Sequence, residues 1–162
     1  MSVSSKQTRF AAISAAAVVA AGALTATQAA AAECPAGKVG VDVVKPGPSK
    51  PSGVTDTVLA SIDLAKEPIH ADGRNLRLRK LVIQPGGIVP WHSHTDRPAI
   101  IYTISGSVTE YRSTCSVPIV HSAGDVTPEV QGTSHWWKNE GKKPAVLLSS
   151  DILHDASDQH MM

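Results

Sequence analysis

The sequence predicts an all-β fold, and two observations lead to that prediction. Short runs rich in β-branched residues follow one another over residues 54–153, separated by turns that contain glycine, asparagine or lysine. No segment of this region has a helical hydrophobic period with capping residues at its ends. Many short strands at regular spacing are typical of a β-sandwich or a β-barrel.

The first 32 residues have the layout of a secretory signal peptide. Lys6 and Arg9 form a short positive start, an apolar run covers residues 10–26, and small residues lead to Ala32. The apolar run is short and only weakly hydrophobic for a membrane anchor. We therefore expect cleavage near Ala32 and an exported chain, periplasmic or secreted.

Composition and charge exclude some classes of partner. The 15 basic and 14 acidic side chains give a formal net charge of +1, and no basic run stands out. We therefore predict no nucleic-acid partner, and no membrane partner once the signal peptide is removed. The mature chain, about 130 residues long, suits one domain.

Two cysteines, Cys34 and Cys115, remain after the expected cleavage. An even number of cysteines in an exported protein favours a disulfide. The alternative is a pair of unpaired, small hydrophobic residues. No cysteine spacing typical of a zinc site is present.

We divide the mature chain into an N-terminal extended arm (33–53), a barrel (54–153) and a flexible tail (154–162). The arm contains the Pro/Gly/Ser-rich stretch KPGPSKPSG. Within the barrel, Val58–Leu64 is the first expected strand. The next, NLRLRKLVI, alternates apolar and basic residues, as a half-buried strand does.

Three sites with turn-forming residues predict chain reversals. The QPGG stretch, Gln84–Gly87, predicts a turn. Gly106 predicts a tight hairpin between two strand-like runs, and NEGKKP, Asn139–Pro144, predicts another.

His92 and His94 are two residues apart at the end of a predicted strand. Side chains alternate along a strand, so both imidazoles point to the same face, as two ligands of one ion require. The spacing alone is a weak signal, because exposed or hydrogen-bonded histidines are found in the same pattern.

The wider spacing of glycines and histidines resembles the two-motif signature of the cupin superfamily, and in particular its small, single-domain, type-2 and quercetin-dioxygenase-like members. The matching positions are Gly86, His92, His94, Gly106, Gly124, Gly132, His135 and Asn139. The resemblance covers residues 76–151. It implies a double-stranded β-helix, or jelly-roll, barrel in which His92, His94 and His135 bind a metal ion.

The sequence departs from the family pattern at two positions. Val130 replaces a proline in a turn, and Ala99 stands where the family has a glutamate ligand. Three imidazoles suit a divalent transition metal, and we take Fe(II) first, with Zn(II), Cu(II), Ni(II) and Mn(II) as alternatives. A site without a carboxylate leaves more positive charge on the ion, which favours an anionic or bidentate oxygen ligand. The alternative is a cupin that has lost its metal.

Strand alternation places Ile101 and Thr103 on the face of position 99, and Trp137 on the face of His135. These three residues are the expected lining of a small-molecule pocket; the alternative for Trp137 is that it belongs to the hydrophobic core. The nearest carboxylates by motif position are Glu110 and Glu129, and neither is identified as a general base.

The remaining candidates are expected to be structural. His70, His121 and His154 lie outside the motifs and are expected in turns or on the surface. Arg97, in the loop after the histidine pair, is expected to be a solvated charge; the alternative is that it holds a carboxylate substrate.

Three functions follow from these features. The first is an exported mononuclear metalloenzyme with dioxygenase or isomerase/lyase chemistry on a small oxygenated or aromatic molecule. The second is a module that binds a small ligand or a metal without turnover. The third is an interaction protein with a vestigial pocket. A homodimer is compatible with all three.

Overall fold

The computed structural model describes residues 33–154 and contains eight strands and one short 3-10 helix within them. The expected signal peptide (1–32) and residues 155–162 of the expected tail lie outside the described residues. The elements, in chain order, are β1 (Ser52–Asp63), η1 (Leu64–Lys66), β2 (Arg74–Ser93), β3 (Ala99–Ser105), β4 (Ser107–Arg112), β5 (Ile119–Ser122), β6 (Val126–Glu129), β7 (Ser134–Lys138) and β8 (Ala145–His154). The predicted all-β class is confirmed.

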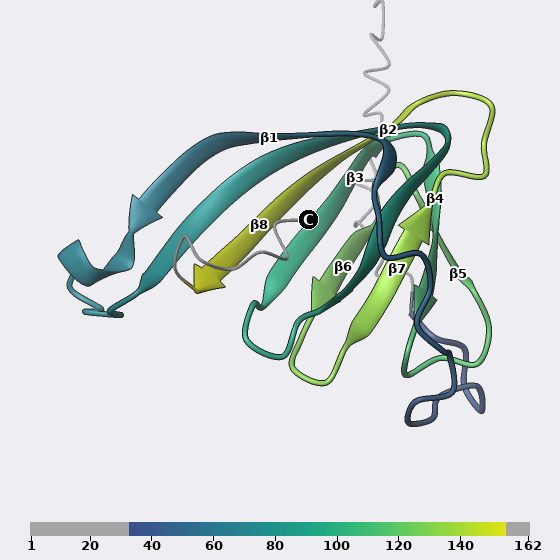
Figure 1. Cartoon of the computed structure of the whole chain (residues 1–162), viewed down its shortest axis with the longest axis horizontal. Coiled ribbons are helices and arrows are strands. Elements are labelled where there is room, and N and C mark those ends of the chain that lie inside the picture. Colours follow the sequence, from purple (N-terminus) through teal and green to yellow (C-terminus); the bar gives the residue numbers. More distant parts are fainter. Residues whose placement is uncertain (1–32, 155–162) are drawn as a thin grey trace, which may run out of the picture.

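The strands wrap into a jelly-roll barrel whose two sides share β2. The first half of β2 pairs with β1 on one edge and with β8 on the other, and β3 and β6 extend this side. The second half of β2 pairs with β7, and β4 and β5 extend the opposite side. Figure 1 shows β1 and the first half of β2 as a long curved ribbon beside the other strands.

The predicted turn at Gln84–Gly87 is a bend inside one continuous strand. Gly86 has φ 75°, and the backbone N–H of Gly86 donates to the carbonyl of Asn139 over 2.8 Å. A Cβ on Gly87 would lie 2.8 Å from the carbonyl oxygens of Gln84 and Gly53. Only glycine fits there, because two backbone segments approach the bend closely.

The predicted hairpins at Gly106 and at Asn139–Pro144 are wrong. β3 pairs with β8 and β6, whereas β4 pairs with β7 and β5, so the chain changes sides at Gly106. A Cβ on Gly106, whose φ is 76°, would lie 2.9 Å from the Pro144 carbonyl oxygen. β7 and β8 likewise pair with different halves of β2 and not with each other. Turn chemistry marked where the chain changes direction but not which strands pair.

The interior is apolar at one end and charged towards the other. The apolar part is a cluster of seven buried side chains, Leu81, Ile83, Val89, Val108, Trp137, Ala145 and Leu147. On the same inner face of β2, Arg77 and Arg79 are 5% and 4% exposed, whereas Leu78 is 37% exposed. The alternation in NLRLRKLVI is therefore real, but the arginines point inward.

The N-terminal arm is attached to the barrel by a disulfide between Cys34 and Cys115. Val39 forms an isolated bridge with Cys115, and the N–H of Val43 donates to the carbonyl of Ser113. The arm ends where β1 begins at Ser52, six residues before the expected strand start at Val58. Within residues 33–154, no helix is long and apolar enough to cross a membrane.

Candidate metal centre

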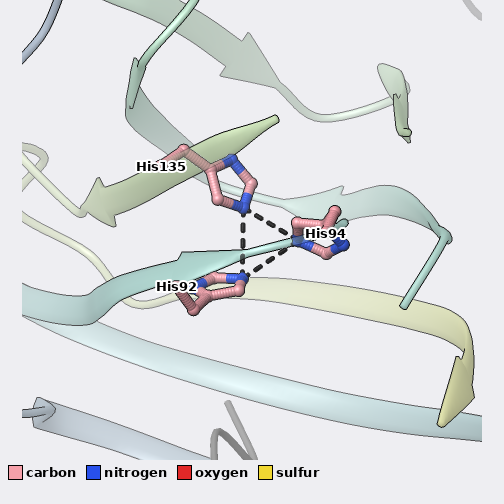
Figure 2. Close-up of side chains that lie close together, drawn as sticks. All are labelled: His92, His94 and His135. Atoms are coloured by element: carbon pink, nitrogen blue, oxygen red, sulfur yellow. Dashed lines mark hydrogen bonds between the residues drawn. The ribbon is translucent and has the colours of Figure 1, made fainter. Parts of the chain in front are cut away.

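Three imidazoles from separate parts of the chain converge inside the barrel (Figure 2). His92 lies in β2, His94 follows the end of β2, and His135 lies in β7. β2 and β7 are neighbours, and His92 is the direct cross-strand partner of His135. The three Nε2 atoms are 3.0, 3.0 and 3.1 Å apart. All three residues are buried.

The partners of the other ring nitrogens fix the tautomers of two of these histidines. Nδ1 of His92 lies 2.8 Å from the carbonyl oxygen of Pro90, and Nδ1 of His94 lies 2.7 Å from that of Arg97. A carbonyl only accepts, so each Nδ1 carries the proton and each Nε2 presents a lone pair. Nδ1 of His135 is 2.5 Å from a carboxylate oxygen of Glu110 and 2.9 Å from the indole Nε1 of Trp137. The indole N–H only donates, but the charged carboxylate is the shorter and stronger contact, which favours a proton on Nδ1 and the same tautomer.

Three lone pairs that face one another repel unless a cation lies between them. The dashed approaches in Figure 2 cannot all be hydrogen bonds, because none of the three Nε2 atoms carries a proton in these tautomers. An ion about 2.1 Å from each nitrogen would be within reach of all three. These residues therefore suit a transition-metal ion with imidazole ligands.

Burial keeps the three rings neutral. It lowers the pKa of His92 well below the ordinary value, with a further contribution from the charges of its histidine neighbours. Burial likewise lowers the pKa of His94 to about 3, and the charge of His135 acts in the same direction. Burial also lowers the pKa of His135, although the hydrogen bond to Glu110 opposes it. The ligand set therefore needs no deprotonation at neutral pH.

Glu110, in β4, is the centre of a buried network behind His135. One carboxylate oxygen accepts from His135 Nδ1, the other accepts from His121 Nε2 over 2.9 Å, and Arg112 donates to both. Burial alone would raise the pKa of Glu110, but the hydrogen bonds from His121, His135 and Arg112 together lower it below the ordinary value. The carboxylate is ionised, and it orients the His135 ring and makes its Nε2 more basic.

His121 and Arg97 are not where they were expected. His121 is fully buried in β5 and accepts a hydrogen bond on Nδ1 from the Thr127 hydroxyl over 2.8 Å. Arg97 is 3% exposed, and its Nε lies 4.0 Å from Asp151. The expectation of surface positions was wrong in both cases, because the barrel closes over these residues and long-range partners compensate their polar atoms.

A second buried carboxylate, Glu129, lies beside this network. Its oxygen is 3.5 Å from His135 Nδ1, and neither oxygen has a hydrogen-bond partner among the residues that the structure describes. Burial raises the pKa of Glu129 well above the ordinary value, and the negative charge of Glu110 adds to the effect. Glu129 is therefore a buried carboxyl group on the Nδ1 side of His135 whose surroundings favour the protonated form.

Position 99, where the family motif has a glutamate, faces the interior of the barrel. Ala99 is 6% exposed and is the cross-strand partner of both Glu129 and Asp151. The clusters with metal-ligand spacing in the described part of the chain are the three histidines and the set Glu110, Glu129 and His135. No carboxylate therefore joins the Nε2 atoms within residues 33–154.

A cavity of ≈ 30 Å³ adjoins the histidines. Its lining includes His92 and His135, the apolar residues Ile101 and Trp137, and the polar residues Arg79 and Ser149. Two of the three expected pocket residues, Ile101 and Trp137, lie there. Thr103 is buried but does not line the cavity. A larger surface hollow of ≈ 410 Å³ reaches the third histidine, His94.

The sequence analysis missed the charged part of this site. Arg77 and Arg79 are buried beside Asp151, and Arg77 holds that carboxylate with two hydrogen bonds of 3.0 and 2.7 Å. The signal was present in the alternation of arginine with leucine, but a basic residue in such a pattern is usually assigned to the solvent face. Only the pairing of β2 with β8 brings Asp151 opposite Arg77.

The family comparison agrees with this fold. The cupin domain family model matches residues 79–151. A curated relative, auxin-binding protein ABP19b of Prunus persica, is 27% identical over 82 residues, which are 49% of this chain and 39% of the relative. The chain therefore spans well under half of the length of that relative.

Two solved structures also resemble part of the chain. A predicted oxalate decarboxylase from Thermotoga maritima has a TM-score of 0.49 and 26% identity, over 62% of this chain and 80% of that one. The cupin domain of Schizosaccharomyces pombe Cnp3 has a TM-score of 0.49 and 13% identity, over 62% and 64%. The family match, the jelly-roll topology and the converging histidines agree, and residues 79–151 form a cupin domain.

Proposed function

We propose that this protein is a mononuclear metal-binding cupin in which His92, His94 and His135 hold a divalent transition metal. The observation that carries the proposal is the convergence of three unprotonated Nε2 atoms to within 3.1 Å of one another. Each ring is held in the required tautomer by a separate acceptor, and burial keeps the lone pairs available at neutral pH. Such an arrangement costs free energy unless an ion occupies it.

We further propose an enzymatic role, with dioxygenase or isomerase/lyase chemistry on a small oxygenated molecule. A bound metal supplies Lewis-acid polarisation or, for iron, redox chemistry. The chain itself supplies a cavity with an apolar side formed by Ile101 and Trp137, which excludes bulk water. Glu110 fixes the orientation of His135. Fe(II) remains our first choice of metal, ahead of Zn(II), Cu(II), Ni(II) and Mn(II).

Metal analysis is the test. After metal-replete expression, we expect about one equivalent of one transition metal per chain by mass spectrometry of the digested protein. We expect the His92→Ala and His135→Ala variants to lose that metal. The exposed His70, whose φ is 48°, offers the control His70→Asn, because asparagine tolerates this conformation. A folded barrel that remains free of metal under these conditions rules out the proposal.

A second candidate is a binding module without turnover, and Ala99 is the observation that favours it. The family glutamate is missing from a position that faces the interior, and no other carboxylate of residues 33–154 joins the Nε2 atoms. Ligand-induced thermal stabilisation without dioxygen uptake or product formation by the iron-loaded protein would select this candidate.

Export and self-association are also proposals. The Cys34–Cys115 disulfide is the kind of bond that persists in oxidising compartments, which supports a periplasmic or secreted location. Ile100, Tyr102 and Ile104 are 57%, 42% and 43% exposed on the outer face of β3. This apolar strip is compatible with a homodimer, and a solution mass measurement tests it.

A further inference from the structure

The N-terminal arm, residues 33–51, lies against the barrel without burying any of its own side chains. Each of these residues is at least partly exposed, so hydrophobic packing contributes little to holding the arm in place. The bond between Cys34 and Cys115 ties the start of the arm covalently to the barrel. Figure 1 shows the arm as the purple and dark blue segment at the lower right, which leads up to β1.

Near the disulfide, the arm is bonded to the residues beside His135. The N–H of Val43 donates to the carbonyl of Ser113 over 2.9 Å. The N–H of Ser113 donates to the carbonyl of Ser134 over 2.7 Å, and the hydroxyl oxygen of Ser113 accepts from the N–H of Ser134 over 3.1 Å. Ser134 immediately precedes His135 in β7. One residue, Ser113, therefore connects the arm to the backbone that positions this ligand.

Further along, the arm contacts the direct sequence neighbours of two ligands. The N–H of Trp91, the residue before His92, donates to the carbonyl of Pro48 over 2.7 Å. Gly47 lies against the indole ring of Trp136, the residue after the ligand of β7, and a Cβ on Gly47 would lie 2.4 Å from that ring. Only glycine allows so close an approach of the arm to this ring.

These contacts place the arm across β2 and β7, the two strands that carry His92 and His135. The Nε2 atoms of these histidines are 3.1 Å apart, and a shared ion must lie about 2.1 Å from both. A displacement of either ligand by about 0.5 Å disturbs such a site. The position of the arm therefore affects the metal centre, even though the three proposed ligands lie in the barrel.

The disulfide that anchors the arm is open to a reductant on the side of Cys34. Cys34 is partly exposed and lines a hollow of ≈ 260 Å³, whereas Cys115 is 0% exposed. A thiolate of an external dithiol attacks Cys34 Sγ, the S–S bond breaks, and Cys115 leaves as a thiolate that takes up a proton. The second thiol of the reductant then displaces Cys34, so the dithiol becomes a disulfide and the protein gains two electrons and two protons.

We propose that the N-terminal arm is a redox-sensitive strap on the metal centre. With the Cys34–Cys115 disulfide intact, the arm holds β2 and β7 in the arrangement that brings His92 and His135 together. Reduction of the disulfide releases the arm, loosens the histidine cluster and weakens metal binding. The inference rests on the proposed metal-site function and adds a chemical condition that regulates it.

Cobalt(II) affinity of the oxidised and the reduced full chain tests this proposal. The protein is reduced with a dithiol, freed of the reductant under argon and titrated with cobalt(II) in competition with a chelator. We expect reduction to weaken binding by about tenfold, within the range by which residues outside a site modulate it. The double variant Cys34→Ser/Cys115→Ser should bind like the reduced protein, which shows that the new thiols do not hold the cobalt.

Gly47→Ala tests the strap without breaking the disulfide, so that a loss of overall stability does not decide the result. The added methyl group collides with Trp136 and lifts the arm from β7. We expect cobalt(II) binding to weaken by about threefold in the oxidised protein. Ser49→Ala, at an exposed position of the same arm, is the matched control and should bind cobalt(II) like the wild type.

Hydrogen exchange in the metal-free protein separates this proposal from the metal-site function. Reduction should speed exchange of the Val43, Trp91 and Ser134 amides, whose hydrogen bonds hold the arm and the segment before His135. If that happens but neither redox state binds cobalt(II), the metal-site function fails and the strap stands. The strap is overturned if these amides stay protected after reduction. It is also overturned if cobalt(II) binds equally tightly to the oxidised and reduced proteins, or if Gly47→Ala binds like Ser49→Ala.

Discussion

The Nδ1 atom of His135 lies 2.5 Å from the carboxylate of Glu110, and this pair connects the cluster of three histidines to β4. Glu110 also accepts from His121 and Arg112, so the orientation of one ligand depends on three strands, β4, β5 and β7. None of the three other residues of the network, Glu110, His121 and Arg112, belongs to the histidine motif.

We expect Glu110→Gln to weaken metal binding by about 10- to 100-fold, the range seen when a hydrogen-bonded partner of a ligand is removed. The amide oxygen of glutamine is uncharged and accepts a weaker hydrogen bond from His135 Nδ1. The Nε2 atom of His135 therefore becomes less basic, and the ring is less firmly oriented. A competition titration against a chelator measures the affinity. Glu140→Gln, a change of the same kind at an exposed position, should leave it unchanged. Equal affinities for the two variants would contradict the positioning role of Glu110.

Glu129→Gln should behave differently from Glu110→Gln. The pKa of Glu129 is raised above its unfolded value of 4.5, so the folded protein keeps a proton that the unfolded chain releases as the pH rises. Wild-type stability should therefore fall with rising pH above about 4.5 through this group, and Glu129→Gln should remove that loss. Urea unfolding at pH 5 and pH 8 checks it. If Glu129→Gln is destabilised relative to the wild type much more at pH 8 than at pH 5, Glu129 is ionised in the folded protein.

Ala99→Glu should restore the missing family ligand at a cost to the metal-free fold. Position 99 faces the interior between Glu129 and Asp151, so a third carboxylate there is destabilising without a cation. We expect tighter metal binding, by at least tenfold, and a metal-free protein less stable by about 1–3 kcal/mol. Chelator competition and urea unfolding measure the two effects, with Ala99→Gln as the uncharged control. The expectation fails if both variants bind metal like the wild type.

Removing the disulfide should destabilise the protein strongly. Cys34 and Cys115 are 81 residues apart, and closing a loop of this length stabilises the fold by roughly 4–5 kcal/mol in the chain-entropy model. We expect the double variant Cys34→Ser/Cys115→Ser to lose several kcal/mol in the free energy of unfolding. Denaturant unfolding under non-reducing conditions measures the loss. A change below 1 kcal/mol would show that the arm contributes little to the stability of the barrel.

Acid should destabilise the metal-free protein through its buried histidines. The pKa of His94 is about 3 in the folded protein and 6.5 in the unfolded chain. Between these values the unfolded chain binds a proton that the folded protein excludes, so stability is fully present above pH 6.5 and falls as the pH decreases towards 3. Each such histidine contributes a slope of up to about 1.4 kcal/mol per pH unit.

Urea unfolding between pH 7 and pH 5, in the presence of a chelator, measures this slope. This interval lies above the range in which most carboxylates titrate. We expect His94→Gln to have a shallower slope than the wild type, and His70→Asn to have the wild-type slope. Identical slopes for the wild type and His94→Gln would mean that His94 is already protonated in the folded protein.

The sequence by itself determined the strand content, the shared face of the histidine pair and the positions of Gly86 and Gly106, at which the chain bends. These properties depend on residues close together in the chain: His92 and His94 share a face because strands have a period of two, and Gly86 is fixed by its own backbone conformation. Motif spacing extended this local information to His135 through the resemblance to the cupins.

Only the tertiary structure decided which strands pair and which charges are buried. Gly106 and NEGKKP resemble hairpin turns because a tight bend has the same local chemistry whether or not the strands beside it become partners. The leucines and arginines of NLRLRKLVI alternate in the same way for either orientation. The arginines face inward because Asp151 is the cross-strand partner of Arg77 and Asp56 is near Arg79. The first pair is separated by 74 positions in the sequence and the second by 23. The energy of a buried charge depends on such distant partners, and a local pattern does not contain them.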